Sequence, residues 1–111
     1  FMPGKPQIWY LDLFAGKNDH EAVQRAGESG HKEINRTNLS VDQIAEGLKK
    51  DVVQKQLALI RMRNTHKAFS EGAEVTISGE ESSLEIRWEY DGTYAELHVN
   101  FEEGTYTIES N

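Results

Sequence analysis

Two runs of alternating apolar and polar residues, at 84–90 and 95–101, constrain the fold of this chain more than any other feature. Strict alternation is typical of a strand with one buried face. Asp91-Gly92 lies between the runs and is a strong signal for a two-residue hairpin turn. The turn predicts these cross-strand pairs: Tyr90 with Thr93, Trp88 with Ala95, Ile86 with Leu97, and Leu84 with Val99. The apolar residues then share one face, so the register is internally consistent.

Two further short runs with strand-like composition flank this hairpin. Residues 73–77 precede it and residues 105–108 follow it, and both are rich in β-branched or aromatic residues. The connections at 78–83 and 102–104 contain glycine or serine. The second half of the chain is therefore predicted to form a four-stranded antiparallel meander with one apolar face.

The longest stretch with helical spacing is 51–69. Val53, Leu57 and Ile60 recur at i, i+4 and i+7, which places them on one face of a helix. Asp51 stands at the start, where a carboxylate complements the helix dipole. This pattern predicts a core-facing amphipathic helix, and His66 is expected to satisfy backbone groups at its end.

A short apolar run at 7–11 follows Pro6. Its aromatic and β-branched content favours a strand buried on both faces, as in a parallel sheet, over a buried helix. Because this run begins so close to residue 1, we expect the chain to be part of a longer protein.

Two shorter helices are predicted between this strand and the long helix. Residues 19–26 can form two turns, with Asn18 or Asp19 as the N-cap. Ser40 and Gln43 have the spacing of a capping box and predict the start of a second helix.

Composition excludes several classes of function. The chain has 111 residues, a net charge of −7, and no block of basic residues, so nucleic acid is a poor partner. It has no cysteine, which excludes a disulfide or a thiolate nucleophile. The four histidines lack metal-ligand spacing. No apolar run approaches the ~20 residues of a membrane helix, and we expect a cytoplasmic protein.

Three motifs, taken in order, resemble one enzyme family. They are PGKPQIWYLD with AGKND at 3–19, KEINR at 32–36, and RMRNTHKAF at 61–69. Together they resemble the C-terminal part of a sucrose phosphorylase of the α-amylase superfamily. The resemblance implies an α+β fragment: the last β/α unit of a (β/α)8 barrel, followed by a four-stranded antiparallel meander. Residues 1–69 would close the catalytic barrel, and residues 70–111 would form the C-terminal β domain.

The resemblance also implies a function. The parent enzyme would phosphorolyse sucrose to glucose 1-phosphate and fructose by a retaining mechanism, without a metal or organic cofactor. Its nucleophile and acid/base would lie outside this chain, so the fragment would have no catalytic residue and would be inactive alone. The resemblance places Arg36 at the glucose subsite, as a hydrogen-bond donor to a sugar hydroxyl. Glu33 and Asn35 would support the loop.

Other interpretations of the same residues are open. Arg36 could only pair with Glu33 or cap a loop. The parent could be a related enzyme: an amylosucrase-like transferase, or a phosphorylase of glucosylglycerate or sucrose 6-phosphate. The chain could instead be a stand-alone α+β module whose apolar run at 8–14 binds a partner.

A strand at 7–11 without neighbours would also expose an edge, so the fragment is expected to self-associate or to be disordered near residues 1–14.

Overall fold

The computed structural model describes residues 1–111, apart from the side chain of Ser29. The chain divides into two compact units. One is Gln7–Leu59, and the other combines Phe1–Pro6 with Ile60–Asn111. The division of the parent protein at residues 69 and 70 stays a prediction.

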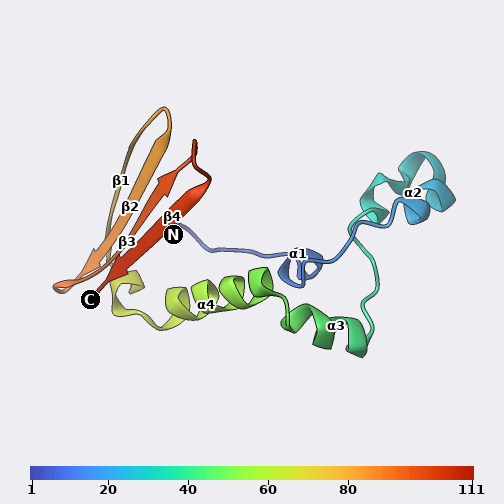
Figure 1. The fold of residues 1–111 in the computed structure, drawn as a ribbon, viewed down its shortest axis with the longest axis horizontal. Helices are drawn as coiled ribbons and strands as arrows, with labels where there is room; N and C mark the ends of the chain where they lie inside the picture. Colours follow the sequence, from blue (N-terminus) through green and yellow to red (C-terminus); the bar gives the residue numbers. More distant parts are fainter. The chain divides into compact units, whose positions relative to one another are not determined.

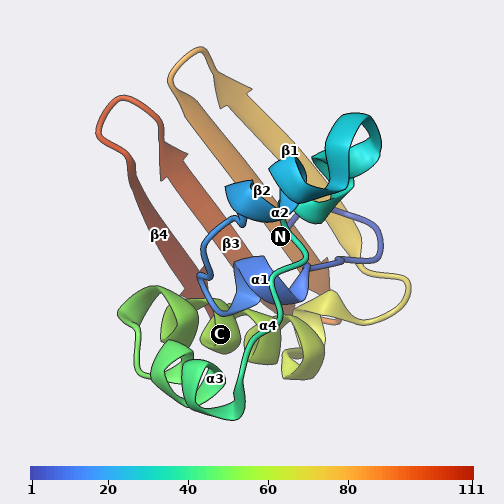
Figure 2. The ribbon, with the colours of Figure 1, turned by 90° about the vertical axis from the view of Figure 1, so that its right-hand side faces the viewer.

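The second unit contains a four-stranded antiparallel sheet in the order β1-β2-β3-β4 (Figure 1). Figure 2 shows the four strands side by side. Their bounds are β1 Glu74–Glu80, β2 Ser83–Tyr90, β3 Thr93–Asn100 and β4 Thr105–Ser110. Every predicted pair is present, from Tyr90 opposite Thr93 to Leu84 opposite Val99. The meander and its register are therefore confirmed.

The β2–β3 turn has the conformation that its sequence predicts. Asp91 has φ +48° and Gly92 has φ +73°. Two central residues with positive φ define a type I′ turn, whose twist matches that of the paired strands. A two-residue turn fixes which residues of the two strands pair in the hairpin.

The core of this unit lies on one face of the sheet. Its buried residues are Ala68, Ile86, Trp88 and Ala95. The ring of Phe69 lies 5.4 Å from that of Trp88. The guanidinium of Arg63 stacks on both rings, 4.4 Å from Trp88 and 4.7 Å from Phe69. The cation and the rings attract each other electrostatically, so this half-buried arginine packs against the core.

The two predicted short helices are present in the unit Gln7–Leu59. Helix α2 spans His20–Ala26, and Asp19 caps it by accepting a hydrogen bond from the Ala22 amide at 2.8 Å. Helix α3 spans Val41–Leu48, and Ser40 and Gln43 form the complete capping box. A 3-10 helix, η1, spans Gly27–Glu33 between them.

The predicted long helix is α4, which spans Asp51–Thr65 and so ends before residue 69. Val53 is fully buried, and Leu57 and Ile60 are half-buried. A separate 3-10 helix, η2, follows at Lys67–Phe69. His66 caps η2, because its Nδ1 accepts a hydrogen bond from the Ala68 amide at 3.3 Å. His66 therefore satisfies a backbone amide, but at the start of η2 and not at the end of the long helix.

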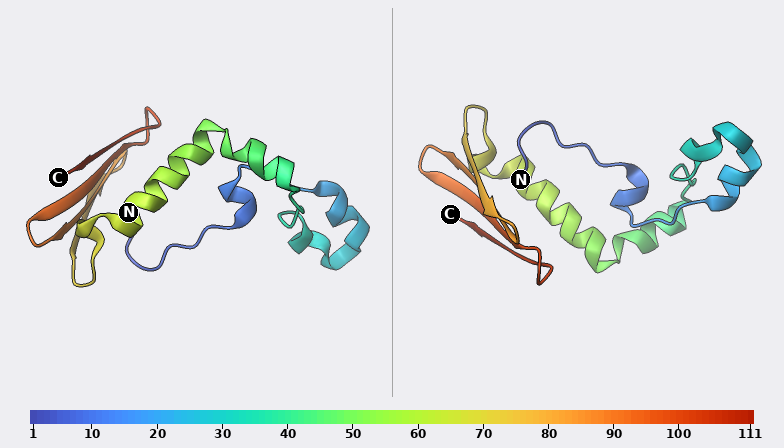
Figure 3. Two further views of the ribbon diagram at one scale, coloured as in Figure 1. Left: turned by 90° about the horizontal axis from the view of Figure 1, so that it is seen from below. Right: turned by 90° about the horizontal axis from the view of Figure 1, so that it is seen from above.

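The predicted strand at 7–11 is wrong for this chain. Trp9 is extended, with φ −73° and ψ 141°, but the short helix α1 begins at the next residue and spans Tyr10–Leu13. Figure 3 shows the extended segment leading into α1. A strand needs neighbours for its backbone N–H and C=O groups, and none of the strands in the described residues pairs with this segment. Ile8 and Trp9 are consequently 45% and 43% exposed.

Among the described residues, no helix has both the length and the apolar composition that a membrane span requires.

Candidate functional site

The loop that carries Arg36 is held by two aromatic side chains from far along the chain. The indole Nε1 of Trp9 donates a hydrogen bond to the Asn35 carbonyl at 2.6 Å. The hydroxyl of Tyr10 donates to the Thr37 carbonyl at 2.9 Å. These two carbonyls flank Arg36 in the sequence, so the backbone is anchored on both sides of this residue.

Two more hydrogen bonds tie the same loop to the segment that follows α1. The Asp19 amide donates to the Ile34 carbonyl at 2.7 Å. The Thr37 hydroxyl donates to the Lys17 carbonyl at 3.1 Å. A loop without regular secondary structure is thus fixed by partners from residues 9–19, all within one compact unit.

The Arg36 side chain contacts Glu33. Its Nη1 lies 3.2 Å from Oε1 of Glu33, and the two side chains are 53% and 42% exposed. Exposed pairs of this kind contribute little to stability, about 0.2–1 kcal/mol. In the described residues, Nε and Nη2 of Arg36 contact no acceptor, so most of its hydrogen-bonding fork stays free for a ligand.

Arg36 lines an open hollow of about 350 Å³. The lining residues are Trp9, His31, Lys32, Ile34, Asn35 and Arg36. This volume lies within the usual range of small-molecule sites, ~300–1,000 Å³. Two cationic side chains beside an indole suit hydroxyl or anionic oxygen atoms as ligands. In the part of the chain that the structure describes, no group of three or more His, Cys, Asp or Glu residues could hold a metal ion.

The predicted site residues are thus close together. The carboxylate of Glu33 accepts a hydrogen bond from Arg36, and the main-chain carbonyl of Asn35 accepts one from Trp9. Nothing in the sequence indicates that Trp9 and Tyr10 belong to this site. They are 26 and 27 residues from their acceptors, and no sequence pattern at this separation indicates a side chain bound to a main-chain carbonyl.

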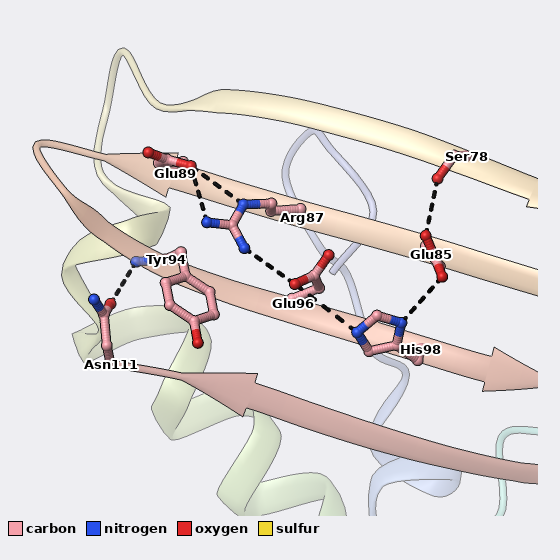
Figure 4. A network of polar contacts seen from close by, with 8 residues as sticks. All are labelled: Ser78, Glu85, Arg87, Glu89, Tyr94, Glu96, His98 and Asn111. Atoms are coloured by element: carbon pink, nitrogen blue, oxygen red, sulfur yellow. Dashed lines mark hydrogen bonds and ion pairs between the residues drawn. The ribbon is translucent and has the colours of Figure 1, made fainter.

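A second polar cluster lies on the outer face of the sheet (Figure 4). Arg87 contacts Glu89 at 3.1 Å and Glu96 at 3.0 Å. His98 lies between Glu85 at 3.3 Å and Glu96 at 3.8 Å. The hydrogen bonds from Arg87 to Glu89 and then to Glu96 raise the pKa of the guanidinium above its ordinary value. Cross-strand opposite charges of this kind stabilise a sheet, so we interpret the cluster as the solvated face of the meander.

Comparisons with known proteins identify the family. No family model matches the chain. The chain is 48% identical, over 97% of its length, to a sucrose 6(F)-phosphate phosphorylase of Ilumatobacter coccineus, of which it covers 20%. It is 36% identical, over 97% of its length, to a sucrose phosphorylase of Agrobacterium vitis, of which it covers 22%.

A solved structure agrees with these relatives. The crystal structure of sucrose 6F-phosphate phosphorylase from Thermoanaerobacter thermosaccharolyticum matches with a TM-score of 0.85 and 37% identity, covering 95% of this chain and 21% of that one. The chain spans about one fifth of the length of the curated relatives it matches. Agreement in sequence and in fold over nearly all its residues shows that this chain is a fragment of a member of the sucrose phosphorylase family.

Proposed function

We propose that the full-length protein is a retaining glucosyltransferase that cleaves a sucrose-type donor with phosphate and releases glucose 1-phosphate. The support is identity of 36–48% to phosphorylases of this type over nearly the whole chain. Retaining enzymes of this chemistry use two carboxyl groups roughly 5–5.5 Å apart. We place both groups in the part of the protein outside this chain.

Two donors follow from the relatives: sucrose, and sucrose carrying a 6F-phosphate. The higher identity to a sucrose 6(F)-phosphate phosphorylase favours the phosphorylated donor. The full-length protein should be assayed with each donor and phosphate, and glucose 1-phosphate should be measured. Release from neither donor would contradict the proposal. A kcat/KM at least tenfold higher for one donor would assign the substrate.

Within this enzyme, Arg36 is the residue of the chain that we assign to the substrate. It donates hydrogen bonds to a hydroxyl of the bound glucosyl ring. Three observations support the assignment: the guanidinium is half-exposed, it faces an open hollow, and its backbone is anchored on both sides. We place residues 1–69 as the closing unit of the barrel; the loop at 34–37 would then lie at the catalytic face, where barrel enzymes carry their substrate-binding residues.

Substitution of Arg36 in the full-length enzyme tests this role. A hydrogen bond from a charged donor is worth about 1.5–3 kcal/mol, so Arg36→Ala should lower kcat/KM by roughly 10- to 150-fold. Arg36→Lys keeps the positive charge but loses the planar guanidinium group with its several donors. Its kcat/KM should therefore lie between those of Arg36→Ala and the unmodified enzyme. The matched control is Arg25→Ala, because Arg25 is an exposed arginine of α2 that pairs with Asp19 and Glu21. Equal effects of the Arg25 and Arg36 changes would contradict the assignment.

The isolated 111-residue chain is expected to be inactive and to self-associate. It lacks the proposed catalytic carboxyl groups, and the apolar side chains of Ile8, Trp9 and Tyr10 are 45%, 43% and 36% exposed. Incubation with donor and phosphate should release no glucose 1-phosphate, and light scattering should show species larger than a monomer. Turnover would contradict our placement of the carboxyl groups. A strict monomer at all concentrations would contradict the self-association.

A further inference from the structure

We propose that Trp9 and Tyr10 are positioning residues for Arg36. Their side chains donate hydrogen bonds to the carbonyls of the residues immediately before and after it, and so hold its guanidinium at the hollow. We call this pair of hydrogen bonds the aromatic clamp. The proposal rests on the assigned role of Arg36, but the clamp itself is a structural feature that can be tested separately.

The local backbone explains how two consecutive side chains reach one loop. Side chains of neighbouring residues in a strand point to opposite faces. Here the extended conformation ends at Trp9, and Tyr10 is the first residue of α1. The change from extended to helical backbone turns both rings toward the same loop, with their centroids 5.0 Å apart. The start of α1 at this residue is therefore what makes the clamp possible.

The geometry also explains why Arg36 needs such support. Its side chain is long and half-exposed, and its only partner in the described residues is the exposed carboxylate of Glu33. Residues 34–37 follow η1 and belong to no helix or strand. A donor must be held close to its final position to be effective. The hydrogen bonds to the carbonyls of Asn35 and Thr37 restrict the motion of the backbone to which the Arg36 side chain is attached.

Conservative substitutions in the full-length enzyme test the clamp. Trp9→Phe and Tyr10→Phe each remove one donor and keep an aromatic ring. Each should lower kcat/KM for the donor sugar by roughly two- to tenfold, the equivalent of one hydrogen bond. The matched control is Tyr106→Phe, which removes the hydroxyl of an exposed tyrosine of β4, and it should leave kcat/KM unchanged.

Repeating both substitutions in an Arg36→Ala background separates positioning from other roles. If Trp9 and Tyr10 act through Arg36, their effect on kcat/KM should disappear once the guanidinium is absent. A loss of the same size in both backgrounds would overturn the proposal, because it would indicate general destabilisation or direct contact with the substrate.

Hydrogen exchange provides a readout that does not depend on activity. Amides at 34–37 should exchange several-fold faster in Trp9→Phe and Tyr10→Phe than in the unmodified enzyme, whereas those of β2 and β3 should not change. Unchanged exchange at 34–37 would overturn the clamp. Faster exchange in the clamp variants, together with full activity of Arg36→Ala, would retain the clamp and reject only the assigned role of Arg36.

Discussion

The contacts that stabilise each of the two units internally differ in kind. In the unit of Phe1–Pro6 and Ile60–Asn111, each strand pairs with the next strand in sequence, and a two-residue turn sets the central register. In Gln7–Leu59, the loop around Arg36 depends on hydrogen bonds between residues 20 to 27 positions apart. The sheet therefore follows from local sequence pattern, whereas the loop around Arg36 depends on distant contacts.

The cores of the two units differ as well. The sheet unit buries Ala68, Ile86, Trp88 and Ala95 in one cluster. Among the described residues of Gln7–Leu59, the fully buried hydrophobic side chains are Leu11 and Val53. Apolar burial is the main source of stability. This difference indicates that the sheet unit carries most of the stability of the chain and that the other unit is the more easily deformed.

The largest expected effect comes from a matched pair of tryptophans. Trp88→Ala removes a side chain that is 7% exposed and should lower the free energy of unfolding by about 3–5 kcal/mol. Trp9→Ala removes a side chain that is 43% exposed and one hydrogen bond, and should cost about 1 kcal/mol. Urea unfolding followed by circular dichroism measures both. Equal losses would mean that the contrast between the units is wrong.

An intermediate effect is expected from two glycines with positive φ. Gly92 in the β2–β3 turn has φ +73°, and Gly27 after α2 has φ +70°; neither has a neighbour where a Cβ would lie. Gly92→Ala should destabilise the sheet by roughly 1 kcal/mol, because an L side chain is strained there. Gly27→Ala should shorten α2 and leave the unfolding midpoint of the sheet unchanged. A shift of that midpoint by Gly27→Ala would show that the units unfold together.

The smallest effect concerns the exposed pair Lys67–Asp91, whose charged atoms are 2.7 Å apart. The hydrogen bond from Lys67 lowers the pKa of Asp91 from its ordinary 3.8 and raises that of Lys67 from 10.5. The carboxylate contributes stability above pH 3.8 that is lost as pH falls through its lowered pKa. The lysine contributes stability below pH 10.5 that is lost as pH rises through its raised pKa.

Lys67→Met should therefore lower the unfolding temperature slightly near neutral pH. The difference from the unmodified chain should vanish in strong acid, and it should also vanish in strong base. A difference that stays constant from acid to neutral pH would show that the pair contributes nothing electrostatic.

The candidate site could be predicted only in part. The resemblance of KEINR to a known family indicates Arg36, and the structure places it beside an open hollow. The apolar and aromatic residues at 7–11 predict a strand that includes Trp9 and Tyr10, not a contact with this loop. Apolar composition indicates burial but not the partner, so it could not show that both rings donate to the loop at 35–37.

The sequence alone determined the elements that depend on near neighbours. The hairpin register follows from a period of two and an Asp-Gly turn. The N-terminal ends of α2 and α3 follow from Asp19 and Ser40, whose side chains accept hydrogen bonds from backbone amides in the first turn of each helix. The conformation of 7–11 and the surroundings of Arg36 depend on contacts between residues far apart in the sequence. A strand is defined by its hydrogen-bonded neighbours, and a loop by the side chains that reach it; neither is encoded in the few residues that form it.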